Sequence, residues 1–163
     1  MKVLKIVVLI IFIGLGCFLF ALNKKVQITY NKFQQDKYDE VVSEYKKIIE
    51  TSPNIVYGYS GLGEVYKEQG KLDDALAEFK KVIEIEPKNG WGYYSVSCVY
   101  SLKKETKQAI EFLQKTIDLN ESFIEYSRGD PDFDNIRHTP EFQQLTNRFL
   151  LTDPISYLVE KVL

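Results

Sequence analysis

The sequence predicts an all-α protein: a short solenoid of about three helix-turn-helix repeats, with an N-terminal transmembrane helix and C-terminal capping helices. The first observation behind this prediction is an internal period of 34 residues. The recurring pairs are Gly58/Gly92, Tyr59/Tyr93, Val65/Val99, Tyr66/Tyr100, Ala75/Ala109, Lys81/Lys115 and Ile83/Ile117. A period of this length predicts one pair of helices per unit, which buries its apolar face by stacking on its neighbours. The other two observations are an uncharged N-terminal run and a proline-punctuated C-terminal end.

Within residues 56–89 the order of large, small and turn residues resembles the tetratricopeptide repeat. The matching residues are Tyr59, Leu62, Gly63, Tyr66, Gly70, Ala75, Phe79 and Pro87. The resemblance implies a protein-binding solenoid in which Ala75, and Ala109 one period later, lie where two helices cross closely.

The same frame extends in both directions. Residues 90–123 form a weaker repeat, with Lys104 at the position of the turn glycine and Glu121 at that of the terminal proline. Residues 22–55 form a degenerate first repeat that keeps the pattern of its second helix. Its first helix departs from the pattern at Lys25, Thr29 and Lys32, and is expected to pack along Val26, Tyr30 and Phe33.

Residues 1–22 are predicted to be a membrane anchor. The run from Ile6 to Leu22 carries no charge, and residues 4–22 as a helix approach the roughly 30 Å of a bilayer core. The alternative is a cleaved signal peptide, although a cut after Ala21 would place Leu19 where a small residue is preferred. The sequence therefore predicts a single-pass membrane protein. The side of the soluble domain stays open, because lysines flank both ends of the run.

Composition limits the remaining possibilities. A chain of 163 residues with 45% hydrophobic residues allows one globular unit and a short appendage. Beyond residue 22, 19 Lys and Arg face 23 Asp and Glu, which speaks against nucleic-acid binding. Two cysteines, Cys17 and Cys98, do not make a framework of disulfides.

Residues 124–163 leave the repeat frame and are predicted to be capping helices. Three helices are expected to begin at Asp130-Pro131, Thr139-Pro140 and Asp153-Pro154, because each pairs an N-cap residue with proline. The segment resembles a tail that follows the last repeat in many bacterial tetratricopeptide proteins. This resemblance implies that four apolar residues cover the last repeat: Phe133, Ile136, Phe142 and Leu145. A final helix would present a second apolar face, suited to oligomerisation, at Ile155, Leu158, Val159 and Val162.

The chain shows no pattern typical of catalysis, of a metal site or of a cofactor site. The acids Asp130, Asp132, Asp134 and Glu141 have the spacing of a calcium loop, but Asn135 replaces its turn glycine. The same acids are explained as helix caps and first-turn charges. A single histidine, His138, is expected on the surface, so the sequence predicts no enzyme.

The resemblance implies a concave groove lined by the second, fifth, ninth and twelfth residues of each repeat, where a protein or peptide partner binds. In the two clearer repeats these residues are Tyr57, Ser60, Glu64, Lys67, Trp91, Tyr94, Cys98 and Ser101. The alternative that Trp91 and Tyr94 instead pack on the capping tail stays open. The first repeat would add Asn23, Val26, Tyr30 and Phe33. The clamp by which one subgroup binds chaperone C-termini is absent, since its positions hold Val26, Tyr30, Gly61, Trp91 and Ser95.

These observations predict a membrane-tethered protein-interaction module of bacterial type, an adaptor or assembly factor. Two alternatives stay open at this point. One is a photosystem-type assembly factor, which has a similar plan of one span and three repeats. The other is a homo-oligomeric scaffold that associates through its last helix.

Overall fold

The structure, a computed structural model, describes residues 2–147, and the side chains of residues 2–19, 21, 22, 29, 30 and 33 lie outside that description. Every regular element in the described range is a helix, which confirms the all-α class. The chain divides into two units, one that ends at Ser43 and one that begins at Glu44.

The first unit consists of a single helix. Helix α1 runs from Lys2 to Thr51 and continues into the second unit without a break. The helix-turn-helix expected at residues 22–55 is therefore not formed, and this expectation is corrected. Asp36, which stands at the position of the turn glycine, stays helical. Lys25 and Lys32 stand where the repeat has aromatic residues, so the apolar surface on which the chain could fold back is reduced.

The predicted membrane anchor falls almost entirely outside the described side chains. Among the residues that the structure describes, no helix is both long enough and apolar enough to cross a bilayer. Of the run from Ile6 to Leu22, only Phe20 has a described side chain, and it is exposed.

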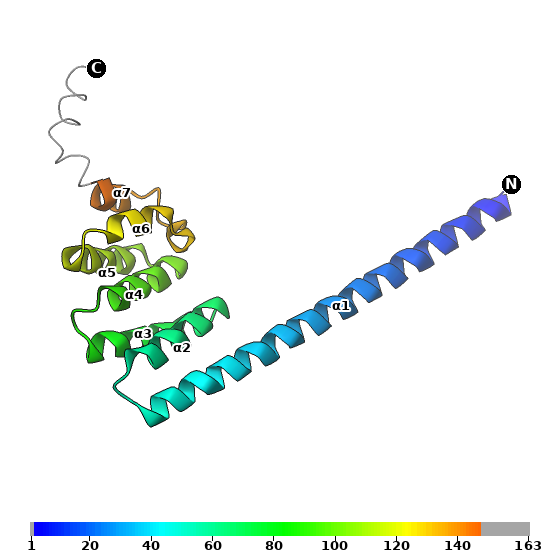
Figure 1. The fold of residues 1–163 in the computed structure, drawn as a ribbon. Coiled ribbons are helices and arrows are strands. Elements are labelled where there is room, and N and C mark those ends of the chain that lie inside the picture. Colours follow the sequence, from blue (N-terminus) through cyan, green and yellow to red (C-terminus); the bar gives the residue numbers. More distant parts are fainter. Residues whose placement is uncertain (1, 148–163) are drawn as a thin grey trace, which may run out of the picture. The chain divides into compact units, whose positions relative to one another are not determined.

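Two helical hairpins form the middle of the second unit. Helix α2 pairs with α3, α4 pairs with α5, and α3 packs on α4, so that the hairpins stack in chain order (Figure 1). The bounds are α2 Val56–Glu68, α3 Leu72–Ile85, α4 Gly90–Leu102 and α5 Thr106–Leu119. Each hairpin thus falls within one 34-residue period.

The turns inside the two hairpins have the same backbone structure. Gly70 has a φ of 71° and Lys104, one period later, has a φ of 61°. In both turns two amides close the end of the preceding helix: Gly70 N bonds to Lys67 O and Lys71 N to Tyr66 O, as Lys104 N bonds to Ser101 O and Glu105 N to Tyr100 O. This is the Schellman motif, which favours glycine because an L side chain is strained at positive φ.

Replacing the strained lysine by glycine is expected to stabilise the protein. Lys104→Gly should raise the free energy of unfolding by about 0.5–1 kcal/mol, since relief of the left-handed strain exceeds the entropy that glycine loses on folding. Urea unfolding followed by circular dichroism measures the change. The reciprocal Gly70→Lys should be destabilising, and equal stability of Lys104→Gly and the natural chain would contradict the assigned strain.

Small residues let the helices approach closely. Ala75 and Ala109 are fully buried in the cores of their hairpins. A Cβ added at Gly63 would lie 2.6 Å from the Phe79 ring, and one added at Gly61 would lie 2.2 Å from the Tyr45 ring. The glycines of α2 therefore serve helix packing, and the last turns of α1 pack on α2 within the second unit.

The repeat period ends after α5. The Tyr59 hydroxyl donates to the carbonyl of Pro53 at 3.1 Å, and Tyr93 repeats this bond to Pro87 at 3.2 Å. One period later the tyrosine is replaced by Ser127, and the proline by Glu121. Helix α6, Phe123–Gly129, nevertheless starts where the first helix of another repeat would start. It stops early because the following Asp130-Pro131 is incompatible with a continuing helix.

The described residues after α5, 120–147, form a tail that closes the end of the stack. After α6 come the 3₁₀-helix η1, Pro131–Phe133, and helix α7, Pro140–Asn147. Asp130 caps η1 by accepting from Asp132 N, and Thr139 accepts from Phe142 N, which confirms both predicted caps. Helix α6 was not expected. The helix expected after Asp153 lies outside the described residues, as does the apolar face from Ile155 to Val162.

The tail shares one apolar core with the second hairpin. Its buried residues pack with Tyr94, Cys98, Ala109, Leu113 and Ile117 of α4 and α5. They are Phe123, Ile124, Phe133, Ile136, Phe142 and Leu145. The prediction that the last four of these cover the final repeat is confirmed.

Candidate functional site

The eight residues predicted to line the groove fall into two groups. Tyr57, Ser60, Glu64 and Trp91 remain at least partly accessible. Tyr94, Cys98 and Ser101 are buried, with exposures of 5, 2 and 0%. Lys67 is intermediate in exposure, because its partly buried ammonium contacts Asp132 of the tail.

The three buried residues do not form an open surface, and this expectation is corrected. The 3₁₀-helix η1 packs on α4, and Phe133, fully buried, has its ring 5.6 Å from that of Tyr94. Asn135 reaches the backbone carbonyl of Ser101 at 3.3 Å. The tail thus occupies the half of the predicted groove that α4 was expected to offer to a partner.

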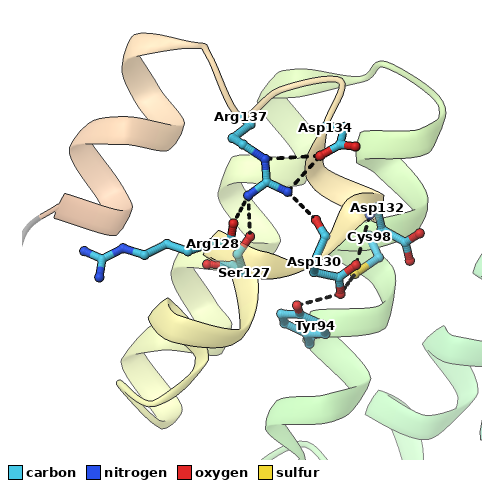
Figure 2. A network of polar contacts seen from close by, with 8 residues as sticks. All are labelled: Tyr94, Cys98, Ser127, Arg128, Asp130, Asp132, Asp134 and Arg137. Atoms are coloured by element: carbon cyan, nitrogen blue, oxygen red, sulfur yellow. Dashed lines mark hydrogen bonds and ion pairs between the residues drawn. The ribbon is translucent and has the colours of Figure 1, made fainter.

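Polar contacts fix the tail against α4 (Figure 2). The Tyr94 hydroxyl donates to Asp130 Oδ2 at 2.8 Å, and the Cys98 thiol lies 3.9 Å from the same oxygen. Burial raises the pKa of Tyr94, and the neighbouring Cys98 and Asp130 raise it further, so the hydroxyl keeps its proton and remains a donor. Asp130 therefore joins the cap of η1 to the inner face of α4.

Lys67 links the tail to the preceding repeat. Its ammonium lies 2.8 Å from Asp132 and 2.9 Å from Glu64. Burial by itself would lower the pKa of Lys67, but the hydrogen bonds to Asp132 and Glu64 outweigh burial and raise that pKa. The groove lysine is thus already occupied by carboxylates of its own chain.

A thiol and two carboxylates meet beside this ion pair. The ligand atoms of Cys98, Asp130 and Asp132 lie within 4.8 Å of one another. Burial raises the pKa of the Cys98 thiol, and the two carboxylates raise it further. The thiol is therefore kept in its protonated form, which is a poor metal ligand and a poor nucleophile. The Lys67 ammonium supplies the positive charge that balances Asp132 here.

Arg137 holds the tail in its bent course (Figure 2). Its guanidinium donates to the carbonyls of Ser127, Arg128 and Asp130, with 2.6 Å to the last. It also pairs with Asp134 at 2.8 Å. The carbonyls at the end of α6, which have no partner within that helix, are satisfied in this way. Together with the contacts of Asp130 and Asp132, this gives each of the three aspartates of the calcium-like spacing a partner within the chain.

Exposed aromatic rings form the accessible part of the site. Trp91 is 55% exposed and makes edge contacts with Phe123, at 4.8 Å between ring centroids, and with Tyr126, at 5.4 Å. Tyr126 is itself half-exposed, and Tyr57, one period before Trp91, is more exposed still. We call Tyr57, Trp91 and Tyr126 the aromatic rim.

Sequence reasoning missed Tyr126 and Phe123. Extending the 34-residue frame beyond residue 123 would have placed a helix start at residue 124, and with it both rings beside Trp91. The contact between Lys67 and Asp132 joins residues 65 positions apart, and no local pattern signals it.

Comparisons with known proteins agree with the geometry. Models of the tetratricopeptide repeat match residues 56–89 and 92–123. The crystal structure of MamA is similar at 20% identity and a TM-score of 0.58, over 80% of this chain and 83% of that one. The first TPR of Spaghetti (RPAP3), bound to the HSP90 peptide SRMEEVD, is similar at 14% identity and a TM-score of 0.52, over 72% and 83%. The search against curated protein sequences gives no match.

At these identities the two structures share the fold alone. The matched segments coincide with the hairpins α2–α3 and α4–α5, which share the same turn hydrogen bonds and each bury one alanine at the crossing. The chain therefore contains two tetratricopeptide repeats, at residues 56–89 and 92–123.

Proposed function

We propose that this protein is a membrane-tethered protein-interaction module of bacterial type, an adaptor or assembly factor without enzymatic activity. It holds a segment of a protein partner on the concave face of α2 and at the start of α4. The observation that carries the proposal is the aromatic rim, where Trp91 and Tyr126 are each 55% exposed and in edge contact with one another.

Exposed aromatic rings suit partner binding. A Trp or Tyr side chain buries a large area and has few torsions to freeze, and such residues dominate the energetics of interfaces. Trp91 is also held in place by Phe123 and Tyr94, with centroid distances of 4.8 and 5.6 Å. The ring is thus oriented before a partner arrives, which lowers the entropy lost on binding.

The tail narrows the surface that a partner can use. With Tyr94, Cys98 and Ser101 buried, the accessible inner face consists of Tyr57, Ser60 and Glu64 on α2 and the ring of Trp91 on α4. A partner segment on this face would run from Trp91 and Tyr126 along α2 and past Tyr57. The peptide bound to the Spaghetti domain is an example of a short ligand on the same fold.

The membrane tether rests on the uncharged run from Ile6 to Leu22. Its length suits a bilayer core, and a single pass would keep the repeats at the membrane surface. The proposed partner is therefore a protein that is itself located at the membrane.

Loss of the rim tryptophan is expected to reduce partner capture. Trp91→Ala should weaken binding by about 2 kcal/mol or more, roughly 30-fold in affinity, as for other aromatic hot spots. The measurement is crosslinking and pull-down of the full chain from native membranes, with quantitative mass spectrometry. Leu119→Ala, which truncates an exposed apolar residue at the end of α5, is the matched control.

Two results would count against the proposal. Equal capture by Trp91→Ala and by the natural chain would show that the rim is not the working surface. Equal loss in both variants would show that the effect is not specific to the rim.

A further inference from the structure

The tail lies in the groove in the manner of a bound peptide. Four of the eight predicted groove residues contact it through polar groups. Tyr94 and Cys98 contact Asp130 (Figure 2), Lys67 contacts Asp132, and the backbone carbonyl of Ser101 accepts from Asn135. If the tail only covered the end of the stack, its buried phenylalanines and aliphatic residues would be enough, and these polar contacts would not be needed. Three of these contacts, those of Lys67, Tyr94 and Cys98, join groove side chains to particular carboxylates, as a recognition site does.

The groove without the tail would present hydrogen-bond donors. Lys67 offers an ammonium, Tyr94 a hydroxyl and Cys98 a thiol, all directed at carboxylate oxygens of the tail. The raised pKa values of Tyr94 and Cys98 agree with protonated donors. Such a set matches a segment with two carboxylates followed by an aromatic ring, which is the chemistry of Asp130, Asp132 and Phe133.

We propose that residues 130–133 are an intramolecular ligand that autoinhibits the groove, and that the partner segment that displaces them is acidic and carries an aromatic residue. The proposal rests on the proposed function in that it names the partner's chemistry. The tail competes at the high effective concentration of a tethered ligand, of the order of millimolar. A short free peptide of the same chemistry therefore binds the natural chain weakly, and binds more tightly once the tail's carboxylates are removed.

The ion pair with Lys67 is the accessible end of this contact. The side chains of Lys67 and Asp132 are 19 and 21% exposed, whereas Phe133 is fully buried. A partner carboxylate can therefore replace Asp132 on Lys67 first, and displacement of Asp130 and Phe133 follows. Glu64, 2.9 Å from the same ammonium, stays in place on α2.

The test uses the tail's own sequence as the probe. A fluorescein-labelled peptide of residues 128–136, RGDPDFDNI, is titrated with the purified full chain in detergent and followed by anisotropy. The variant Asp130→Ala/Asp132→Ala removes both carboxylates, so that residues 130–133 leave α4 more readily, while Ile136, Phe142 and Leu145 still hold the rest of the tail on the second hairpin. It is expected to bind the peptide at least 10-fold more tightly than the natural chain.

Three controls sharpen this result. A probe with asparagine in place of the first two aspartates, RGNPNFDNI, should bind at least 10-fold more weakly to the double variant. Adding Lys67→Met to the double variant should lower the affinity for the acidic probe by a similar factor. Asp132→Ala alone should give an intermediate affinity, and circular dichroism melting confirms that each variant unfolds cooperatively.

Several outcomes would overturn the inference. These are equal binding of the acidic probe to the natural chain and the double variant, equal binding of both probes, or no binding of either up to millimolar concentration. Failure here is distinguishable from failure of the proposed function, since the peptide titration does not use the native partner. Capture that depends on Trp91 while the titration fails would remove only the autoinhibition.

Discussion

Phe133→Ala is expected to lower the free energy of unfolding of the second unit by about 3–5 kcal/mol, the range for truncating a buried phenylalanine. Phe133 is fully buried and its ring contacts those of Tyr94 and Phe142, with centroid distances of 5.6 and 5.5 Å. Truncation would leave a cavity between η1, α4 and α7. The tail is short, so few other side chains can move in to fill this cavity. Urea unfolding followed by circular dichroism measures the loss.

The matched control is an aromatic residue of similar size on the surface. Tyr57 is 62% exposed, so Tyr57→Ala should change stability by no more than about 0.5 kcal/mol. Hydrogen exchange on Phe133→Ala should show lost protection in α4 and α7 together, because the tail and the second hairpin share one core. A loss below about 1 kcal/mol would show that the tail folds separately from the repeats.

Arg137→Met has the second largest expected effect, a loss of about 2–3 kcal/mol. Methionine keeps an apolar stem of comparable length but removes every donor to the carbonyls of Ser127, Arg128 and Asp130. Unpaired buried carbonyls cost about 1–3 kcal/mol each, and the partial exposure of this side chain lets water offset some of that loss. Thermal melting and urea unfolding measure the change.

Two further variants separate the geometry of Arg137 from its charge. Arg137→Lys keeps the charge but lacks the planar fork, so it should restore less than half of the lost stability. Arg128→Met removes a contact to one carbonyl, that of Thr146, and a pair with the exposed Glu125, so it should cost less than Arg137→Met. Full rescue by Arg137→Lys would show that the charge and not the hydrogen-bond geometry matters.

The repeats were predictable because their signals are local and recur. Ala75 and Ala109 mark the crossings, and the Tyr59 and Tyr93 hydroxyls make the same bond to a carbonyl six residues earlier. The caps at Asp130 and Thr139 were predictable for a similar reason, since a cap forms between residues two or three apart. Local geometry and spacing are enough for such features.

The length of α1 was not predictable from the residue at the position where the repeat has its turn glycine. Lys104 occupies the turn glycine's place in the second hairpin and still adopts a φ of 61°, whereas Asp36 at the equivalent place stays helical. Absence of glycine therefore does not decide whether a turn forms. The difference lies in packing, because α4 and α5 bury their apolar faces against each other, whereas the segment before Asp36 carries Lys25 and Lys32 where the repeat has aromatic residues.

The state of the groove was also beyond the sequence. Tyr94 and Cys98 stand at positions that line an open groove in the resembling family, and their residue types suit a peptide contact or a buried one equally well. What buries them is a tail that returns from 36 residues away to Tyr94 and from 65 residues away to Lys67. The prediction that the tail caps the stack was correct, and two alternatives were open for Trp91 and Tyr94, an exposed groove or packing on the tail. In the structure Tyr94 is buried against the tail, whereas Trp91 contacts Phe123 and Tyr126 and stays 55% exposed.

The sequence by itself determined the helical class, the 34-residue unit, the two hairpins and the residues of the capping core, because periodicity and capping are written in neighbouring positions. Only the tertiary structure decided which groove residues are open. Tyr57 and Trp91 remain exposed, while Asp130 and Asp132 close the rest through contacts with Tyr94 and Lys67. The physical reason is that pairing between distant polar groups depends on where the folded backbone places them. The apolar residues of the tail are likewise buried only because α4 and α5 lie against them.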